Sequence, residues 1–291
     1  MRFFYRKIRN VYKRLLQLWQ MTSCRSVMGV PLTLCTVGAV QSVTSMHNVI
    51  YVLCSLSPTI LRFDATTHQR LRNFSVNVTS LMSPHDIVAC ERTSQLYIAD
   101  YECVWRVSGD GTDVQRWLPT TPTDKMNPWT LSVTSAHVLV TLPDVMQLVQ
   151  FDSGGNELRR IKLPSHFVPR HAIQSPAGTF IVSHNDTQLD RDLVSEVGTS
   201  GEVLRQFGGS GLPSLRWPDH LDVDSRGNVF VADTYSRRIL LLDTQLKLRR
   251  VIVDEHQLNS KPLRGLHYLE QTRHLLVALD DSVAVFDLSD H

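Results

Sequence analysis

Short runs in which apolar and polar residues alternate recur along most of the chain. Residues 217–243, WPDHLDVDSRGNVFVADTYSRRILLLD, contain three such runs, at Leu221 and Val223, Val229 and Val231, and Ile239 and Leu241. A period of two is typical of β-strands, and the DSRGN segment supplies Gly227 and Asn228 where a hairpin requires positive φ angles. The stretch therefore predicts three antiparallel strands, and residues 246–253, LKLRRVIV, predict a fourth.

Copies of this unit fill the rest of the chain. Four copies begin with a proline, and these prolines lie 41 to 49 residues apart, at Pro84, Pro128, Pro169 and Pro218. Two weaker copies cover residues 40–64 and 263–287. All-β repeats of this length are typical of propeller blades. The six copies therefore predict an all-β fold, a six-bladed β-propeller over residues 32–291.

The last copy has three predicted strands and ends at Asp287, so its sheet lacks an outer strand. Residues 32–37, LTLCTV, form a further strand-like segment just before the first copy. We expect this segment to complete the last sheet, because a ring closed in this way has no open sheet edge.

The residues of the 217–243 copy also resemble a known repeat. They follow the pattern of the NHL repeat: Pro-x-Gly/His-aliphatic, then Gly-Asn-x-aromatic/aliphatic-Val-Ala-Asp, then a short loop that ends in Arg-aliphatic. The match is strong in this copy, fair in the copy from Pro84 and degenerate in the others. The resemblance implies a six-bladed propeller like the C-terminal propeller of tripartite-motif proteins. The zinc ligands of a RING finger or B-box are not in the sequence, so ubiquitin-ligase activity is not implied.

Residues 1–31 have a different pattern and are expected to form a basic amphipathic helix with a linker. Basic residues lie on one side of this helix, at Arg2, Arg6, Arg9 and Lys13, and apolar residues lie on the other, at Phe4, Ile8, Val11 and Leu15. Three interpretations remain open. Residues 1–20 contact an anionic membrane surface, serve as an Arg-rich mitochondrial presequence, or pack against protein.

Composition narrows the choice of compartment and partner. The formal net charge is +2, too small to indicate a polyanion partner by itself. The five cysteines form no CxxC pattern, which favours a reducing, cytoplasmic location, with the mitochondrion as the alternative. No apolar run reaches the roughly 20 residues that span a bilayer. A monomeric propeller is expected.

One face of the disc is predicted to bind a partner. In an antiparallel blade, the loop before the first strand and the loop between the second and third strands lie on the same face. This face would carry Tyr101, Trp129, Arg170, Trp217, Tyr235, Arg237, Arg238 and Arg264. Aromatic rings beside arginines suit a protein or peptide, and they also suit the stacked bases of single-stranded RNA, which some NHL propellers bind. As alternatives, the tryptophans wedge between blades and the arginines form structural ion pairs. A long charged loop over residues 184–196 is also expected here.

The central channel offers a few candidates for chemistry. It would be lined by the first residues of the innermost strands, Ser42, Asp86, Thr130, His171, His220 and Gly265. Asp86, His171 and His220 could hold Zn²⁺. The amidating lyase that cleaves peptidyl-hydroxyglycine is similar in fold and uses three channel histidines, whereas this chain has two. Six-bladed lactonases hold calcium with Glu, Asn and Asp, and of these six positions Asp86 alone suits such a cation.

The sequence favours a binding protein over an enzyme. It contains no GxSxG, Walker or HExxH motif, and no nucleophile or acid–base pair can be assembled from it. We therefore expect a non-catalytic scaffold without a cofactor or metal, which binds a protein or peptide. The first alternative is a single-stranded RNA-binding domain, and the second is a channel-metal lyase or lactonase-like hydrolase.

Overall fold

The computed structural model describes residues 32–35, 39–55, 57–76, 83–118, 126–135, 137–208, 214–258 and 261–289. The predicted basic helix within residues 1–31 lies outside the described residues. Among the described residues, no helix has the length and hydrophobicity needed to cross a membrane.

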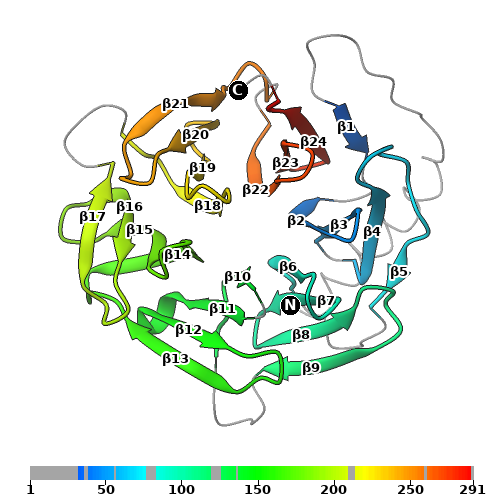
Figure 1. Ribbon diagram of the computed structural model, residues 1–291, viewed down its shortest axis with the longest axis horizontal. Helices are drawn as coiled ribbons and strands as arrows, with labels where there is room; N and C mark the ends of the chain where they lie inside the picture. The colour runs from blue at the N-terminus through cyan, green and yellow to red at the C-terminus, as the bar shows by residue number, and fades with distance from the viewer. Residues whose placement is uncertain are drawn as a thin grey trace, which may run out of the picture.

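The described strands form six four-stranded antiparallel sheets around a central axis, which confirms the predicted six-bladed β-propeller (Figure 1). From the axis outwards, blade 1 consists of β2 (Val40–Met46), β3 (Val49–Cys54), β4 (Thr59–Asp64) and β5 (Phe74–Ser75). Blade 2 consists of β6 (Asp86–Cys90), β7 (Gln95–Asp100), β8 (Cys103–Ser108) and β9 (Val114–Leu118). Blade 3 consists of β10 (Thr130–Thr134), β11 (His137–Leu142), β12 (Gln147–Phe151) and β13 (Glu157–Lys162). A short 3₁₀ helix, η1 (Pro143–Val145), joins β11 to β12.

Blades 4 to 6 continue the ring in the same order. Blade 4 consists of β14 (Phe167–Gln174), β15 (Phe180–Asp186), β16 (Arg191–Val197) and β17 (Val203–Phe207). Blade 5 consists of β18 (Pro218–Val223), β19 (Val229–Asp233), β20 (Arg238–Leu242) and β21 (Leu248–Val253). Blade 6 consists of β22 (Leu263–Leu269), β23 (His274–Leu279), β24 (Ser282–Asp287) and β1 (Leu32–Cys35).

The ring closes through β1, as the sequence predicts. β1 pairs antiparallel with β24, with Leu32 opposite Val285 and Cys35 opposite Ser282. Leu34 is buried against Val283 and Val285 in the core between blades 6 and 1. The first strand of the propeller therefore completes the last blade and covers its outer edge.

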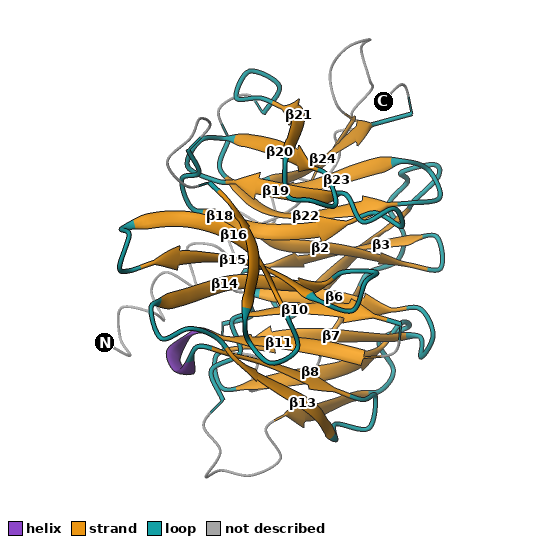
Figure 2. Ribbon diagram, turned by 60° about the vertical axis from the view of Figure 1, so that its left-hand side comes forward, coloured by secondary structure: helices purple, strands orange, loops and turns teal. Residues whose placement is uncertain are grey.

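The hydrophobic core is divided among the interfaces between neighbouring blades. The second strand of a blade is buried on both faces because it lies between two other sheets, and every residue of β19 is buried. Between blades 2 and 3, the Trp117 ring lies 4.6 Å from the Tyr97 ring and 5.8 Å from the Phe151 ring, centroid to centroid. Figure 2 shows the sheets stacked side by side around the disc.

A β-bulge lies at the start of four innermost strands. The register shifts between Val40 and Ser42, Pro169 and His171, Pro218 and His220, and Leu263 and Gly265. Each shift skips one residue of the innermost strand, just before its predicted channel position. We call the face where the innermost strands begin the upper face and the opposite face the lower face.

The prediction of a long loop over residues 184–196 is wrong. Most of this segment belongs to β15 and β16, which are joined by a turn at residues 187–190. Asn185 pairs with Asp192, and Asp186 pairs with Arg191. The charges suggested a loop, but the two strands continue through this segment, and His184, Asp186 and Leu193 are buried in them.

Candidate functional site

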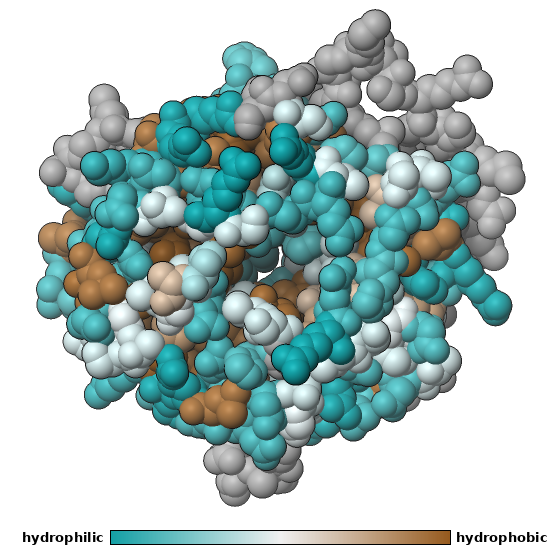
Figure 3. All heavy atoms as spheres, in the orientation of Figure 1, coloured by the Kyte–Doolittle hydropathy of each residue, from teal (hydrophilic) through white to brown (hydrophobic). Residues whose placement is uncertain are grey.

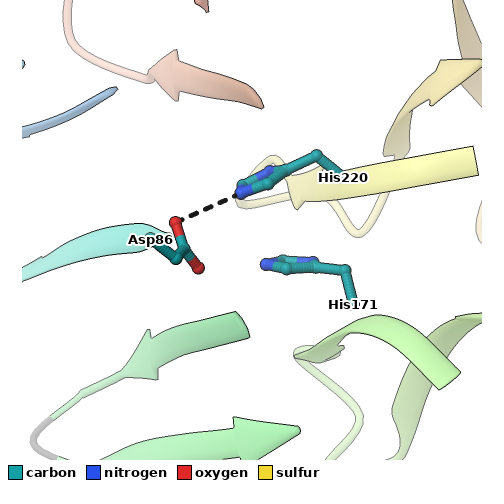
Figure 4. A group of neighbouring side chains, drawn as sticks. All are labelled: Asp86, His171 and His220. Atoms are coloured by element: carbon teal, nitrogen blue, oxygen red, sulfur yellow. Dashed lines mark ion pairs between the residues drawn. The ribbon is translucent and has the colours of Figure 1, made fainter. Parts of the chain in front are cut away.

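Three titratable side chains meet in the channel at the level where the innermost strands begin. Asp86 comes from blade 2, His171 from blade 4 and His220 from blade 5, and Figure 4 shows both imidazoles directed toward the carboxylate. One ligand-type atom from each residue lies within 4.8 Å of the others, and all three residues are buried. These are the three channel candidates predicted from the sequence.

Asp86 is held as a carboxylate by donors from neighbouring blades. Its Oδ1 accepts hydrogen bonds from Ser42 Oγ at 2.6 Å and from the Ile87 N–H at 2.9 Å. Its Oδ2 accepts the Leu131 N–H of blade 3 at 2.8 Å. Burial alone would raise the pKa of Asp86, but His220, His171 and Ser42 hold it well below its usual range.

His171 is satisfied by the backbone on both sides. Its Nε2 lies 3.1 Å from the Leu131 carbonyl oxygen, so Nε2 carries the proton, and its Nδ1 accepts the Leu221 N–H at 3.3 Å. Burial lowers the pKa of His171 to about 3. The neutral ring therefore ties blades 3 and 5 to blade 4, and it stacks on His220 with centroids 4.0 Å apart.

His220 has the opposite environment. Its Nε2 lies 3.6 Å from Asp86 Oδ1, beyond hydrogen-bond distance, and among the described residues neither ring nitrogen has a hydrogen-bond partner. Burial alone would lower the pKa of His220, but the Asp86 carboxylate outweighs burial and raises it above its ordinary value. Asp86 and His171 are both engaged in hydrogen bonds, whereas the ring nitrogens of His220 have no such partner among the described residues. His220 is thus the group of this cluster that can accept a proton without breaking a hydrogen bond.

The cluster does not fit a three-ligand metal centre. Catalytic zinc sites take three protein ligands and keep one position open. Asp86 and His220 each offer a donor atom, but the Leu131 carbonyl and the Leu221 N–H already occupy the two nitrogens of His171. A third ligand would require His171 to break one of its bonds between blades.

A cavity of about 100 Å³ lies in the channel, which opens where the disc is hollowed at its centre (Figure 3). It extends from the channel histidines toward the lower face, and its lining includes Thr44, Ser132, His171, His220, Asp222 and His267. It is much smaller than the roughly 300–1,000 Å³ of sites that enclose a drug-sized ligand. A drug-sized molecule would therefore extend beyond this cavity.

The predicted aromatic residues are exposed on the upper face. Tyr101, Trp129, Trp217 and Tyr235 are 59%, 42%, 40% and 62% exposed. Trp217 stacks on Tyr235 at 5.4 Å between centroids, and the buried guanidinium of Arg170 lies 3.7 Å from the centroid of the Trp217 ring. Both tryptophans therefore contact the neighbouring blade and still expose apolar surface on this face.

The predicted arginines are all engaged in ion pairs. Arg170 pairs with Asp192, Arg237 with Glu255, Arg238 with Asp233 and Arg264 with Asp280, at nitrogen–oxygen distances of 2.8 to 2.9 Å. An arginine neutralised by a carboxylate gains less from a phosphate contact. The RNA-binding alternative thus draws no support from these four side chains.

The sequence analysis missed three titratable residues of the innermost strands, which lie beside or beyond the predicted channel positions: Asp219, Asp222 and His267. Asp219 is the residue skipped by the bulge next to His220, and burial raises its pKa. Asp222 and His267 lie two residues after the channel positions His220 and Gly265, on the same side of their strands. The period of two in a strand predicts that residues two positions after the predicted channel residues also face the channel. Applied to His220 and Gly265, this rule would have identified Asp222 and His267.

The fold is similar to that of several solved propellers. No protein-family model and no curated protein matches this sequence. A catalytically inactive histidine-to-alanine variant of virginiamycin B lyase from Staphylococcus aureus, solved with quinupristin, is 12% identical with a TM-score of 0.61, over 86% of this chain and 80% of that chain. A streptogramin B lyase is 9% identical with a TM-score of 0.64, over 87% and 96%. A gluconolactonase from Xanthomonas campestris is 12% identical with a TM-score of 0.66, over 87% of both chains.

These comparisons correct the expected function. The similar propellers named above are two lyases and a lactonase, so the expectation of a non-catalytic scaffold that is not an enzyme is wrong. The comparisons do not confirm that the propeller is of the NHL type or that it is similar to the propellers of tripartite-motif proteins. The predicted six-bladed fold is confirmed. The sequence analysis placed Asp86 and His220 in the channel but weighed them as metal ligands, whereas the ring sets them 3.6 Å apart from blades 2 and 5.

Proposed function

We propose that this chain is a propeller enzyme of the lyase or lactonase type, in which His220 exchanges a proton with the substrate. The observation that carries the proposal is the buried imidazole of His220, which lies 3.6 Å from an ionised carboxylate and whose nitrogens have no hydrogen-bond partner among the described residues. A buried polar group without a partner costs about 1–3 kcal/mol, so such a group needs an explanation beyond packing.

Both reaction types need a group with the proton affinity of His220. An elimination requires a base that removes a proton next to the bond being broken and an acid that protonates the leaving oxygen. Lactone hydrolysis requires a base that takes a proton from the attacking water. An imidazole whose pKa lies above the ordinary value of 6.5 serves as acid and base near neutral pH.

Asp86 and His171 support His220 without sharing its role. The Asp86 carboxylate stabilises the protonated imidazole, and hydrogen bonds from Ser42 and Leu131 fix its position. His171 stays neutral and stacks on the His220 ring, so it limits the orientations that this ring can adopt. We assign both as positioning residues.

The exposed aromatic residues of the upper face fit a separate contribution to binding. We propose that Trp217 and Tyr235 bind a peptide or a peptide-like part of the substrate, because large rigid aromatic surfaces bury area at low entropic cost. The positive φ angle of Trp217, 62°, is uncommon for a residue with a side chain, and the bond from its N–H to Asp192 holds it.

Turnover of defined substrates tests the proposal. The purified chain is incubated with glucono-δ-lactone, other five- and six-membered lactones, and quinupristin, and products are followed by NMR and mass spectrometry. We expect turnover of at least one member, with kcat/KM at least about 100-fold lower in His220→Gln, because general acid–base catalysis contributes about 10²–10⁴-fold.

His166→Gln is the matched control. His166 Nε2 also lies 3.6 Å from a carboxylate, that of Asp186, but His166 does not line the channel cavity. We expect its kcat/KM to stay within about twofold of the wild type. Turnover that survives in a folded His220→Gln variant, or that is lost equally in both variants, contradicts the assignment of His220.

A further inference from the structure

A second group of side chains meets near the lower end of the channel. Ser45 lies on β2 of blade 1, Asp222 on β18 of blade 5 and His267 on β22 of blade 6. These three blades follow one another around the ring, and their innermost strands converge on the axis (Figure 1). Asp222 lies two residues after His220, which places it about 7 Å further along the channel.

The three side chains are connected as nucleophile, base and orienting acid. Ser45 Oγ lies 2.8 Å from His267 Nε2, and His267 Nδ1 lies 3.3 Å from Asp222 Oδ2. A carboxylate next to Nδ1 places the imidazole proton on that nitrogen and leaves Nε2 free to accept the serine proton. This connectivity, rather than position in the sequence, identifies a Ser-His-Asp triad.

The orienting carboxylate is itself fixed. Asp222 Oδ2 accepts the Tyr268 N–H at 2.7 Å, and Oδ1 accepts the Val223 N–H at 2.8 Å. Burial alone would raise the pKa of Asp222, but His267 and the two backbone donors hold it below its usual range. Asp222 is therefore an ionised acceptor with a defined direction, as an orienting residue requires.

The group remains accessible, in contrast to the upper cluster. The side chains of His267 and Asp222 are 27% and 23% exposed, and both line the channel cavity. His171 bridges blades through backbone groups at both nitrogens, whereas His267 has a hydroxyl on one side and a carboxylate on the other. The innermost strands are also sheet edges, so alternate N–H groups face the channel, the type of donor that binds an oxyanion.

We infer that Ser45, His267 and Asp222 form a second catalytic site that transfers the acyl group of small carboxylic esters. As Ser45 Oγ bonds to the acyl carbon, its proton passes to His267 Nε2. The imidazolium gives this proton to the leaving alkoxide as the carbon–oxygen bond breaks. Water then bonds to the acyl carbon and gives a proton to Nε2, and that proton returns to Oγ as the carboxylic acid leaves.

The cavity limits the substrate class. A volume of about 100 Å³ holds a short acyl chain, and the walls combine Ile87, Leu131 and Leu266 with His267 and Asp222 of the triad. Esters with a short apolar acyl group match this lining. This site is distinct from His220, so the inference does not depend on the proposed lyase or lactonase activity.

Covalent labelling tests the inference. The full chain is treated with methanesulfonyl fluoride, a small reagent that sulfonylates an activated serine with loss of fluoride, and the adduct is weighed intact and mapped by peptide mass spectrometry. We expect a single adduct on Ser45, no adduct in Ser45→Ala, and labelling at least about 100-fold slower in His267→Gln.

Ser132 provides the matched control. It lines the same cavity, but its Oγ has no hydrogen-bond partner among the described residues and hence no base. Ser132 should stay unlabelled, and Ser132→Ala should label Ser45 at the wild-type rate within about twofold.

Three outcomes would overturn the inference: no adduct on Ser45 in the folded wild-type protein, equal labelling of Ser132, or a Ser45 adduct that forms as fast in His267→Gln. His220→Gln separates the two sites. It should abolish lactone turnover and leave Ser45 labelling intact, so failure of either proposal is visible independently of the other.

Discussion

His171 and His220 stack on each other in the channel, but they hold protons with opposite tendencies. The pKa of His171 is lowered to about 3, because burial and the neighbouring charge of His220 outweigh Asp86 and the bond to the Leu131 carbonyl, which raise it. The pKa of His220 is raised, because the Asp86 carboxylate 3.6 Å away outweighs the effect of burial. The two rings thus differ in hydrogen bonding and in proton affinity, although their centroids lie 4.0 Å apart.

The lowered pKa of His171 predicts a loss of stability in acid. Between pH 6.5 and 3 the unfolded chain binds a proton at this residue and the folded chain does not, so the free energy of unfolding decreases as pH falls. For this residue the loss at pH 5 is about 2 kcal/mol, from an unfolded pKa near 6.5. Urea titrations at pH 7 and pH 5 check this, and in His171→Gln the decrease should be about 2 kcal/mol smaller. An unchanged decrease in the variant would contradict the assignment of a buried neutral imidazole.

At the scale of single elements, the turns between strands differ in how closely they approach a neighbouring blade. Gly201 connects β16 to β17 with a φ angle of 94°, and an added Cβ would lie 2.2 Å from the Lys162 carbonyl oxygen at the end of β13 in blade 3. Gly178 connects β14 to β15 with a φ angle of 84°, and an added Cβ would meet nothing within 4 Å. The two glycines share a backbone conformation and differ in surroundings.

This difference predicts unequal costs for the same substitution. Gly178→Ala should lower the free energy of unfolding by about 1–2 kcal/mol, the cost of a left-handed backbone with a Cβ. Gly201→Ala should lower it by about 2 kcal/mol more, because the blade 3 strand must also move away. Chemical denaturation of both variants measures the difference. Equal losses would show that the contact between blades 3 and 4 carries no such constraint.

At the scale of the whole molecule, the repeat predicts the architecture but not the chemistry. The spacing of the prolines and the period-two runs predicted six blades, the closure by β1 and the ring position of Asp86, His171 and His220. These features follow from local patterns repeated along the chain. The distance between Asp86 and His220 and the triad around His267 depend on where separate blades meet, so no local motif encodes them.

Protonation of His220 in the folded protein is the measurement that tests the account most directly. Nitrogen-15 spectra of the histidine rings, recorded between pH 5 and 8 and assigned with His220→Gln, give its pKa. The account predicts a midpoint above 6.5 that falls in Asp86→Asn, because the carboxylate stabilises the charged imidazole. A midpoint at or below 6.5 in the wild-type protein would show that burial dominates at His220. His220 would then lack the proton affinity on which the proposed chemistry depends.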